Sequence, residues 1–154
     1  MNNDTKNIKK IIECIQKEID LFICQSMSLE IIEKRNDIEC IGKRYFSTIT
    51  LEDKGLFTIT MNIDDDLFDV FFNNFFDCEL EENEKEELID ALPSEIINTI
   101  VGLAIKDFPE EFENLQLGLP SLESINGADY QFSNTFSIKT NNGSLCFHIV
   151  YSDN

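Results

Sequence analysis

The stretch S-E-I-I-N-T-I-V-G, Ser94 to Gly102, combines the apolar pattern of a core helix with polar residues on its other side. On a helix, residues three or four positions apart share a face. Glu95 and Asn98 can therefore point together, with Gly102 in the same row as Asn98. The opposite side is apolar and suits burial: Ile96, Ile97, Ile100, Val101 and Ala104. The stretch predicts a half-buried helix that presents an acid, an amide and a bare backbone position.

The chemistry of this pair is suggestive but incomplete. A carboxylate accepts hydrogen bonds and can hold a cation, whereas a carboxamide both donates and accepts, so it can orient a water molecule. A carboxamide is not a proton acceptor at neutral pH, so the pair alone makes a poor hydrolase. It suits a protein that positions water for chemistry whose metal and electrophile lie on a partner. The tetrapeptide itself is unspecific, because E-x-x-N also occurs at Glu33/Asn36, Glu111/Asn114 and Glu123/Asn126.

Three helices are predicted around and before this stretch. Residues 7–24 carry isoleucines and a phenylalanine at steps of three and four, which is typical of an amphipathic helix. Leu67 to Phe76 forms a broad aromatic helical face, preceded by aspartates that can cap it and complement its dipole. Residues 82–106 have a helical period interrupted by Pro93, which predicts a kink or a fresh start close to that proline.

The remaining segments predict an antiparallel sheet. Turn signals at 53–55 and at Asn142-Gly143 join segments of strand character into two hairpins, 41–50 with 56–63 and 130–139 with 144–151. Residues 28–34 are ambiguous between helix and strand, and L-Q-L-G-L-P, residues 115–120, reads as a short strand. We expect one α+β domain over residues 1–154, with a mainly antiparallel sheet packed against long helices.

Composition excludes several classes of partner. The net charge of −18 disfavours nucleic acid and anionic lipid surfaces. We find neither an apolar run long enough to span a membrane nor a signal-peptide core, so we expect a cytoplasmic protein that binds neither nucleic acid nor membrane. The 5 cysteines form no C-x-x-C pair and are expected to be buried thiols without a disulfide.

Metal sites are likewise not indicated. The single histidine, His148, alternates with apolar residues and supports neither a catalytic triad nor a histidine-rich metal site. A calcium loop starting at Asp64 would need Gly at its sixth position and Glu at its twelfth, but Asp69 and Phe75 stand there. We therefore expect no metal bound by the chain itself.

The wider pattern resembles the CheC, CheX and FliY family of chemotaxis phosphatases. Pro120 follows Asn98 with 21 residues between, which gives E-x2-N-x21-P, and Gly102 adds N-x3-G. The other three E-x-x-N pairs have no proline at that offset. The similar order of elements extends from about Ile8 to Tyr151. One signature copy in a short chain looks like CheX, because CheC typically carries two.

The resemblance implies that the chain dephosphorylates a phosphorylated CheY-type response regulator. Glu95 would dock on the receiver's active-site lysine, and Asn98 would orient the attacking water. Thr99 and Gly102 would join the partner-binding surface, with Pro120 shaping a nearby strand end. The protein would need no cofactor of its own, since Mg²⁺ belongs to CheY. Relatives form homodimers through sheet edges, so the resemblance also implies a homodimer of that kind.

The chain departs from the family pattern at one position, and the fold also occurs without the activity. Family members usually carry Asp or Ser four residues before the motif Glu, where this chain has Ala91, and Pro93 interrupts the helix nearby. The fold is also shared by non-catalytic modules such as the middle domain of FliM, so fold alone proves no activity. A binding module of the flagellar switch or chemotaxis system, or a scaffold whose Glu95 and Asn98 merely face solvent, remains the alternative.

Overall fold

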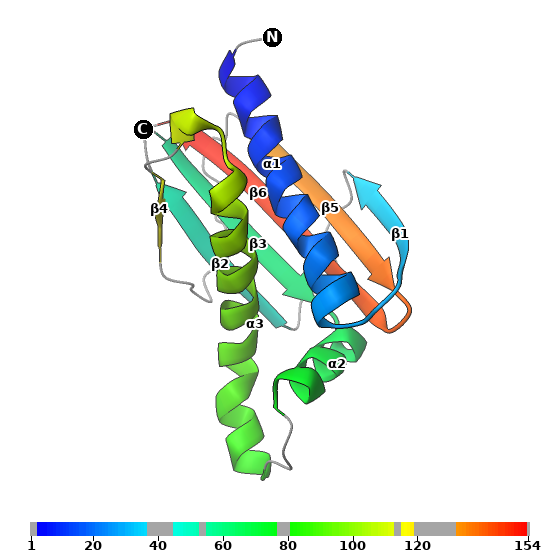
Figure 1. Ribbon diagram of the computed structural model, residues 1–154. Helices are drawn as coiled ribbons and strands as arrows, with labels where there is room; N and C mark the ends of the chain where they lie inside the picture. Colours follow the sequence, from blue (N-terminus) through cyan, green and yellow to red (C-terminus); the bar gives the residue numbers. More distant parts are fainter. Residues whose placement is uncertain are drawn as a thin grey trace.

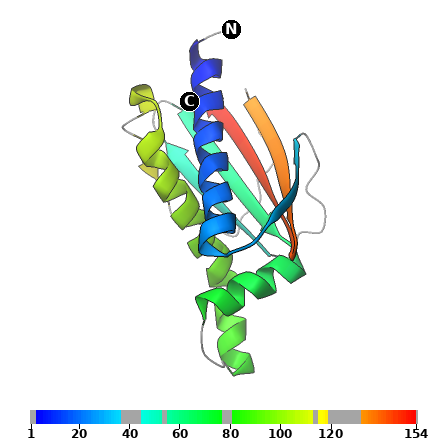
Figure 2. The same cartoon turned by 45° about the vertical axis from the view of Figure 1, so that its right-hand side comes forward.

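The computed structural model describes residues 3–36, 45–52, 55–76, 81–112, 115–118 and 132–153. Long helices cover one face of a six-stranded antiparallel sheet, as Figures 1 and 2 show from two directions. The predicted α+β class, with a mainly antiparallel sheet against long helices, is confirmed. The helices are α1 (Asn3–Leu21), α2 (Asp65–Phe75) and α3 (Glu82–Ala104), and short π and 3-10 turns follow α1 and α3.

The sheet has the strand order β1-β5-β6-β3-β2-β4, and every neighbouring pair is antiparallel. Its strands are β1 (Ile31–Asn36), β2 (Tyr45–Glu52), β3 (Gly55–Ile63), β4 (Gln116–Leu117), β5 (Phe132–Thr140) and β6 (Gly143–Asp153). The ambiguous segment at 28–34 thus leads into a strand, which pairs with β5. Both predicted hairpins form, with their paired strands in the middle of the sheet. Residues 41–44, 53–54, 119–120 and 130–131 of the predicted strands and turns lie outside the described residues.

The core lies between the sheet and the two long helices. Alternate residues of the central strands point toward α1 and α3 and are buried: Phe57, Ile59, Met61, Phe147 and Ile149. The isoleucines of α1 that recur at helical spacing meet them and are also buried: Ile8, Ile11, Ile12, Ile15 and Ile19. Apolar residues at every second position of the strands and at a spacing of 3.6 residues in the helix therefore face each other and form one apolar layer.

The long helix α3 bends but is not interrupted. Its two parts, residues 82–89 and 91–107, meet at an angle of 42°. Pro93 has no N–H, so the carbonyl of Ile89, four residues earlier, lacks its helical donor, and the proline ring crowds that carbonyl. The sequence left a kink and a fresh start open, and the structure shows the kink.

No single helix among the described residues is long and apolar enough to cross a membrane. The two parts of α3 meet the length and composition requirement only when taken together across the bend.

Asp64 ties the start of α2 to the hairpin of β5 and β6. One carboxylate oxygen accepts from the backbone N–H of Leu67 at 3.0 Å, and the other accepts from that of Ser144 at 2.7 Å. Gly143 lies against this junction with φ +115°, and a Cβ there would come within 2.5 Å of the Asp64 side chain. The glycine of the predicted Asn-Gly turn is thus required by both its backbone conformation and its neighbour.

The cysteines depart from expectation. Cys146 on β6 is disulfide-bonded, whereas Cys14 and Cys24 are free thiols, and Cys24 is exposed. The prediction of buried thiols without a disulfide is therefore wrong for Cys146 and Cys24. The spacing of cysteines along a chain does not reveal a pair that tertiary structure brings together. Cys40 and Cys78 lie outside the described residues.

We expect Asp64→Ala to destabilise the fold by about 2 kcal/mol, because it removes a helix cap and leaves the Ser144 N–H without its acceptor. Urea unfolding followed by circular dichroism measures the loss. Asp69→Ala, an exposed change on the same helix, is the control and should lie within about 0.5 kcal/mol of wild type. Equal stability of the two variants would contradict the role given to Asp64.

Candidate functional site

Burial of one side of α3 fixes how the helix is rotated. The predicted apolar residues are all at most 1% exposed: Ile96, Ile97, Ile100, Val101 and Ala104. They pack against β2, β3 and α1. Rotating the helix by a quarter turn would expose some of these side chains to water. Each large side chain exposed in this way would cost about 1.5–3 kcal/mol of folding free energy. The opposite side of α3 is therefore held toward solvent.

Two neighbouring rows at four-residue spacing form this solvent side, which we call the outer face of α3. One row is Ala91, Glu95, Thr99 and Leu103, and the other is Ser94, Asn98, Gly102 and Lys106, the last just beyond the helix end. Glu95 is exposed, while Asn98, Thr99 and Gly102 are half-buried. The structure thus brings together the four residues predicted to bind a partner.

The hydroxyl group of Thr99 donates its hydrogen bond within the helix and not toward solvent. Its Oγ1 donates to the backbone carbonyl of Glu95 at 2.9 Å. This internal bond leaves the Glu95 carboxylate and the Asn98 amide as the strongest polar groups at the centre of the outer face.

Gly102 opens onto free space. A Cβ built at this position would meet no atom within 4 Å. The glycine is therefore not needed to let α3 pack against its own chain.

The polar groups of the outer face can form ion pairs and hydrogen bonds. Among the described residues no group of three His, Cys, Asp or Glu side chains is arranged to hold a metal ion. Glu95 can pair with a cation, and Asn98 can both donate to and accept from a water or an oxyanion.

Other residues singled out by the sequence are placed less fully. Pro120 and the side chain of Asp90 lie outside the described residues. Ala91 is exposed one turn before Glu95, so the position where the resemblance leads one to expect Asp or Ser has no polar side chain. His148 shares a hydrogen bond of 3.0 Å with Ser133 and alternates with the core residues of β6, so it points away from the helices and takes no part in the site.

Sequence reasoning missed two exposed residues of the outer face, Leu103 and Lys106. Leu103 is 44% exposed, one of four large apolar side chains that are exposed among the described residues. Both could have been found by extending the Glu95 and Asn98 rows in further steps of four.

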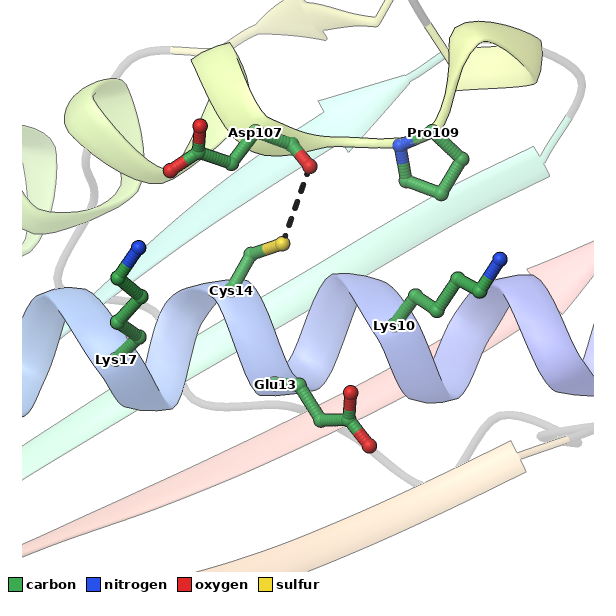
Figure 3. Close-up of a pocket in the computed structure, with 6 residues that line it drawn as sticks. All are labelled: Lys10, Glu13, Cys14, Lys17, Asp107 and Pro109. Atoms are coloured by element: carbon green, nitrogen blue, oxygen red, sulfur yellow. Dashed lines mark hydrogen bonds between the residues drawn. The ribbon is translucent and has the colours of Figure 1, made fainter.

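A pocket of about 440 Å³ also went unpredicted, because it joins residues far apart in the sequence. It lies between α1 and the segment after α3 and is lined by Lys10, Glu13, Cys14, Lys17, Asp107 and Pro109. Figure 3 shows the thiol of Cys14 at its centre, where it donates to the Asp107 carbonyl at 3.3 Å. Burial, followed by the charges of Asp107 and Glu13, raises the pKa of this thiol, which keeps it protonated and unreactive.

Solved structures of chemotaxis proteins share this architecture. The chemotaxis protein CheX from Vibrio vulnificus has a TM-score of 0.71 at 12% identity, over 92% of this chain and 99% of that chain. A CheC-like superfamily protein from Shewanella sp. PV-4 gives 0.66 at 15% identity, over 99% of both chains. A chain of the CheX–CheY–BeF3–Mg²⁺ complex from Borrelia burgdorferi gives 0.65 at 11% identity, over 92% of this chain and 97% of that chain.

No protein-family model and no curated protein matches the sequence. The chain thus has the CheC/CheX-like fold, and the resemblance drawn from Glu95, Asn98 and Pro120 is confirmed at the level of fold. At these identities the likeness concerns architecture and not the roles of individual residues.

Gly102→Ala tests whether packing within the chain requires the glycine. We expect it to stabilise the isolated protein by about 0.5–1 kcal/mol, because alanine restricts the unfolded chain and meets no neighbour in the folded one. Thermal and urea unfolding measure the change. A destabilised variant would show instead that the glycine is required by packing within the chain.

Proposed function

We propose that this CheX-like chain is a phosphatase that hydrolyses the aspartyl phosphate of a CheY-type response regulator, ending its signal. The observation that carries the proposal is the outer face of α3, where Glu95 and Asn98 project side by side from a helix that the core holds in place. The shared fold with CheX, one of which was crystallised with CheY, BeF3 and Mg²⁺, supports the choice of partner.

Each residue has one task in the proposed reaction. The Glu95 carboxylate pairs with a lysine at the receiver's active site, which sets the position of α3 over the phosphoryl group. The Asn98 amide then holds a water in line with the aspartyl oxygen–phosphorus bond. Water attacks phosphorus, that bond breaks, and the products are the receiver's free carboxylate and inorganic phosphate. The metal charge comes from Mg²⁺ bound by the receiver, and this chain supplies no cofactor.

Such a division of labour fits the physics of phosphoryl transfer, which depends on positioning and charge stabilisation more than on a protein nucleophile. A rigid helix fixed by five buried side chains can hold an amide in place. Gly102, one turn beyond Asn98, lets the receiver's backbone come close. A location in the cytoplasm belongs to the same proposal and remains a prediction.

We expect Asn98→Ala to abolish most of the acceleration of phosphate release while leaving receiver binding largely intact, because the amide acts on water. Each tenfold loss of rate corresponds to about 1.4 kcal/mol of transition-state stabilisation. Glu95→Ala should weaken binding as well. The measurement is phosphate release from phosphorylated, Mg²⁺-loaded CheY, beside binding to CheY carrying beryllium fluoride.

Asn73→Ala and Glu87→Ala, exposed changes on α2 and on α3 before its bend, are the matched controls and should behave as wild type. A wild-type rate for Asn98→Ala would disprove the water-positioning role. Binding without any acceleration by the wild-type protein would favour the alternative, a non-catalytic binding module.

We further propose that the homodimer implied by the resemblance forms through β1. This strand is one edge of the sheet, and its residues 32–36 are exposed, with Ile32 at 59%. The other edge, β4, has only 2 residues. Two copies of I-I-E-K-R-N paired antiparallel about a two-fold axis place Glu33 of each copy opposite Lys34 or Arg35 of the other. Within one chain Arg35 pairs with Glu33 and Lys34 with Asp20, so pairs between the copies would form in exchange for these exposed ion pairs.

Ile32→Lys should therefore shift the protein toward monomer without loss of stability, because the side chain is exposed in the monomer but would be covered in the dimer. Light scattering after size-exclusion chromatography measures the mass. Leu117→Lys, on the β4 edge, is the control. Dissociation by the Leu117 variant and not by the Ile32 variant would assign the interface to the opposite edge.

A further inference from the structure

Two side chains in one row of the outer face, Glu95 and Thr99, can only accept hydrogen bonds from a partner. The Glu95 side chain is exposed, and neither of the two ion pairs found among the described residues includes it. An ionised carboxylate has no proton to donate. The Thr99 hydroxyl has one proton, which it donates to the backbone carbonyl of Glu95 at 2.9 Å. Only the lone pairs of its oxygen are left for a partner, so Thr99 is an acceptor as well.

These two acceptors lie one helical turn apart on the same side of α3. Residues at positions i and i+4 are separated by about 6 Å along the helix axis, with their Cβ atoms about 5–6 Å apart. Side chains of a helix lean toward its N-terminus, so Thr99 leans toward Glu95. The longer and exposed Glu95 side chain can bring its carboxylate beside Oγ1 of Thr99. One donor group of a partner can therefore reach both oxygens.

The hydrogen bond within the helix also fixes the Thr99 hydroxyl. Threonine in a helix divides between two rotamers, and a bond from Oγ1 to the carbonyl four residues earlier selects one of them. A hydroxyl that donates a hydrogen bond is polarised, which strengthens a bond that its oxygen accepts. Threonine is a weaker helix former than alanine, and such a bond to the carbonyl does not improve the helix. The oxygen of Thr99 is thus a fixed acceptor that the stability of α3 does not require.

We propose that Thr99 is a positioning residue, whose Oγ1 accepts a second hydrogen bond from the receiver lysine that pairs with Glu95. The inference rests on the proposed function, in which that lysine binds at Glu95. An ammonium group has three N–H donors, so it can bond to the carboxylate and to the hydroxyl oxygen at the same time. A carboxylate at the end of a flexible side chain leaves the position of the lysine along α3 loosely defined. A second bond to Thr99 fixes that position next to Asn98.

A shared cation makes the contributions of Glu95 and Thr99 to binding depend on each other. When the carboxylate is replaced by an amide, the lysine is held less firmly beside Thr99, and loss of the hydroxyl then costs less. If Thr99 acted on the helix alone, its contribution would be the same with either side chain at position 95. A double-mutant cycle separates these two roles.

The test compares wild type with Thr99→Val, Thr99→Ser, Glu95→Gln and the double variant Glu95→Gln, Thr99→Val. Calorimetry measures binding to CheY carrying beryllium fluoride and Mg²⁺, and phosphate release at a series of CheY phosphate concentrations gives KM and kcat. Thr135→Val is the matched control, because Thr135 is also half-buried but pairs with His148 on the face of the sheet away from the helices. Thermal unfolding checks that each variant is folded.

We expect Thr99→Val to bind the receiver about tenfold more weakly, since it loses a hydrogen bond to a charged group. The loss should raise KM and change kcat by less than about twofold, because the bond holds the receiver before and during the reaction. Thr99→Ser keeps the hydroxyl and should bind within about twofold of wild type. In the Glu95→Gln background, Thr99→Val should cost less than about threefold.

Thr99→Val that binds like wild type and like the Thr135 control would overturn this inference alone. So would losses at Glu95 and Thr99 that simply multiply, because they would show that the two side chains do not share a cation. A wild-type protein that binds no receiver and releases no phosphate would overturn the inference together with the proposed function.

Discussion

The burial of one side of α3 is the constraint on which the rest of the molecule depends. Five apolar residues of that helix are removed from water against β2, β3 and α1, so the helix has a single acceptable rotation. Every property of the outer face follows from that rotation, including the exposure of Glu95, the half-burial of Asn98 and the open space beside Gly102. The core thereby holds the backbone that carries the Asn98 amide in one position.

The bend at Pro93 and the distribution of charged residues make the two parts of α3 different. The carbonyl of Ile89 loses its helical donor, and the two parts of α3 part by 42°. The first part is acidic, while the second ends beside the lysines of α1. The two parts of α3 therefore differ in direction and in charge.

Much of the fold followed from local pattern. Alternation predicted the hairpins, period 3.6 predicted α1 and α3, and aspartates before an aromatic run predicted the cap of α2, which Asp64 provides. The ambiguous residues near 28–34 became an edge strand because β5 offers them a partner, a long-range contact that no local window contains. The disulfide of Cys146 escaped prediction for the same reason. The site residues Glu95, Asn98, Thr99 and Gly102 share a face by spacing alone, whereas the free space at Gly102 and the pocket beside Asp107 became visible only in three dimensions.

The sequence by itself determined that α3 has an apolar side and a side bearing an acid, an amide and a glycine, because helical geometry ties spacing directly to direction. It also determined the hairpins and the strongly negative charge. Tertiary structure alone decided that α1 runs antiparallel to α3, that Cys14 of α1 meets the Asp107 carbonyl, and that β1 is the longer edge strand among the described residues. Those features depend on contacts between residues distant in sequence, which form only when burying the common core brings the elements together.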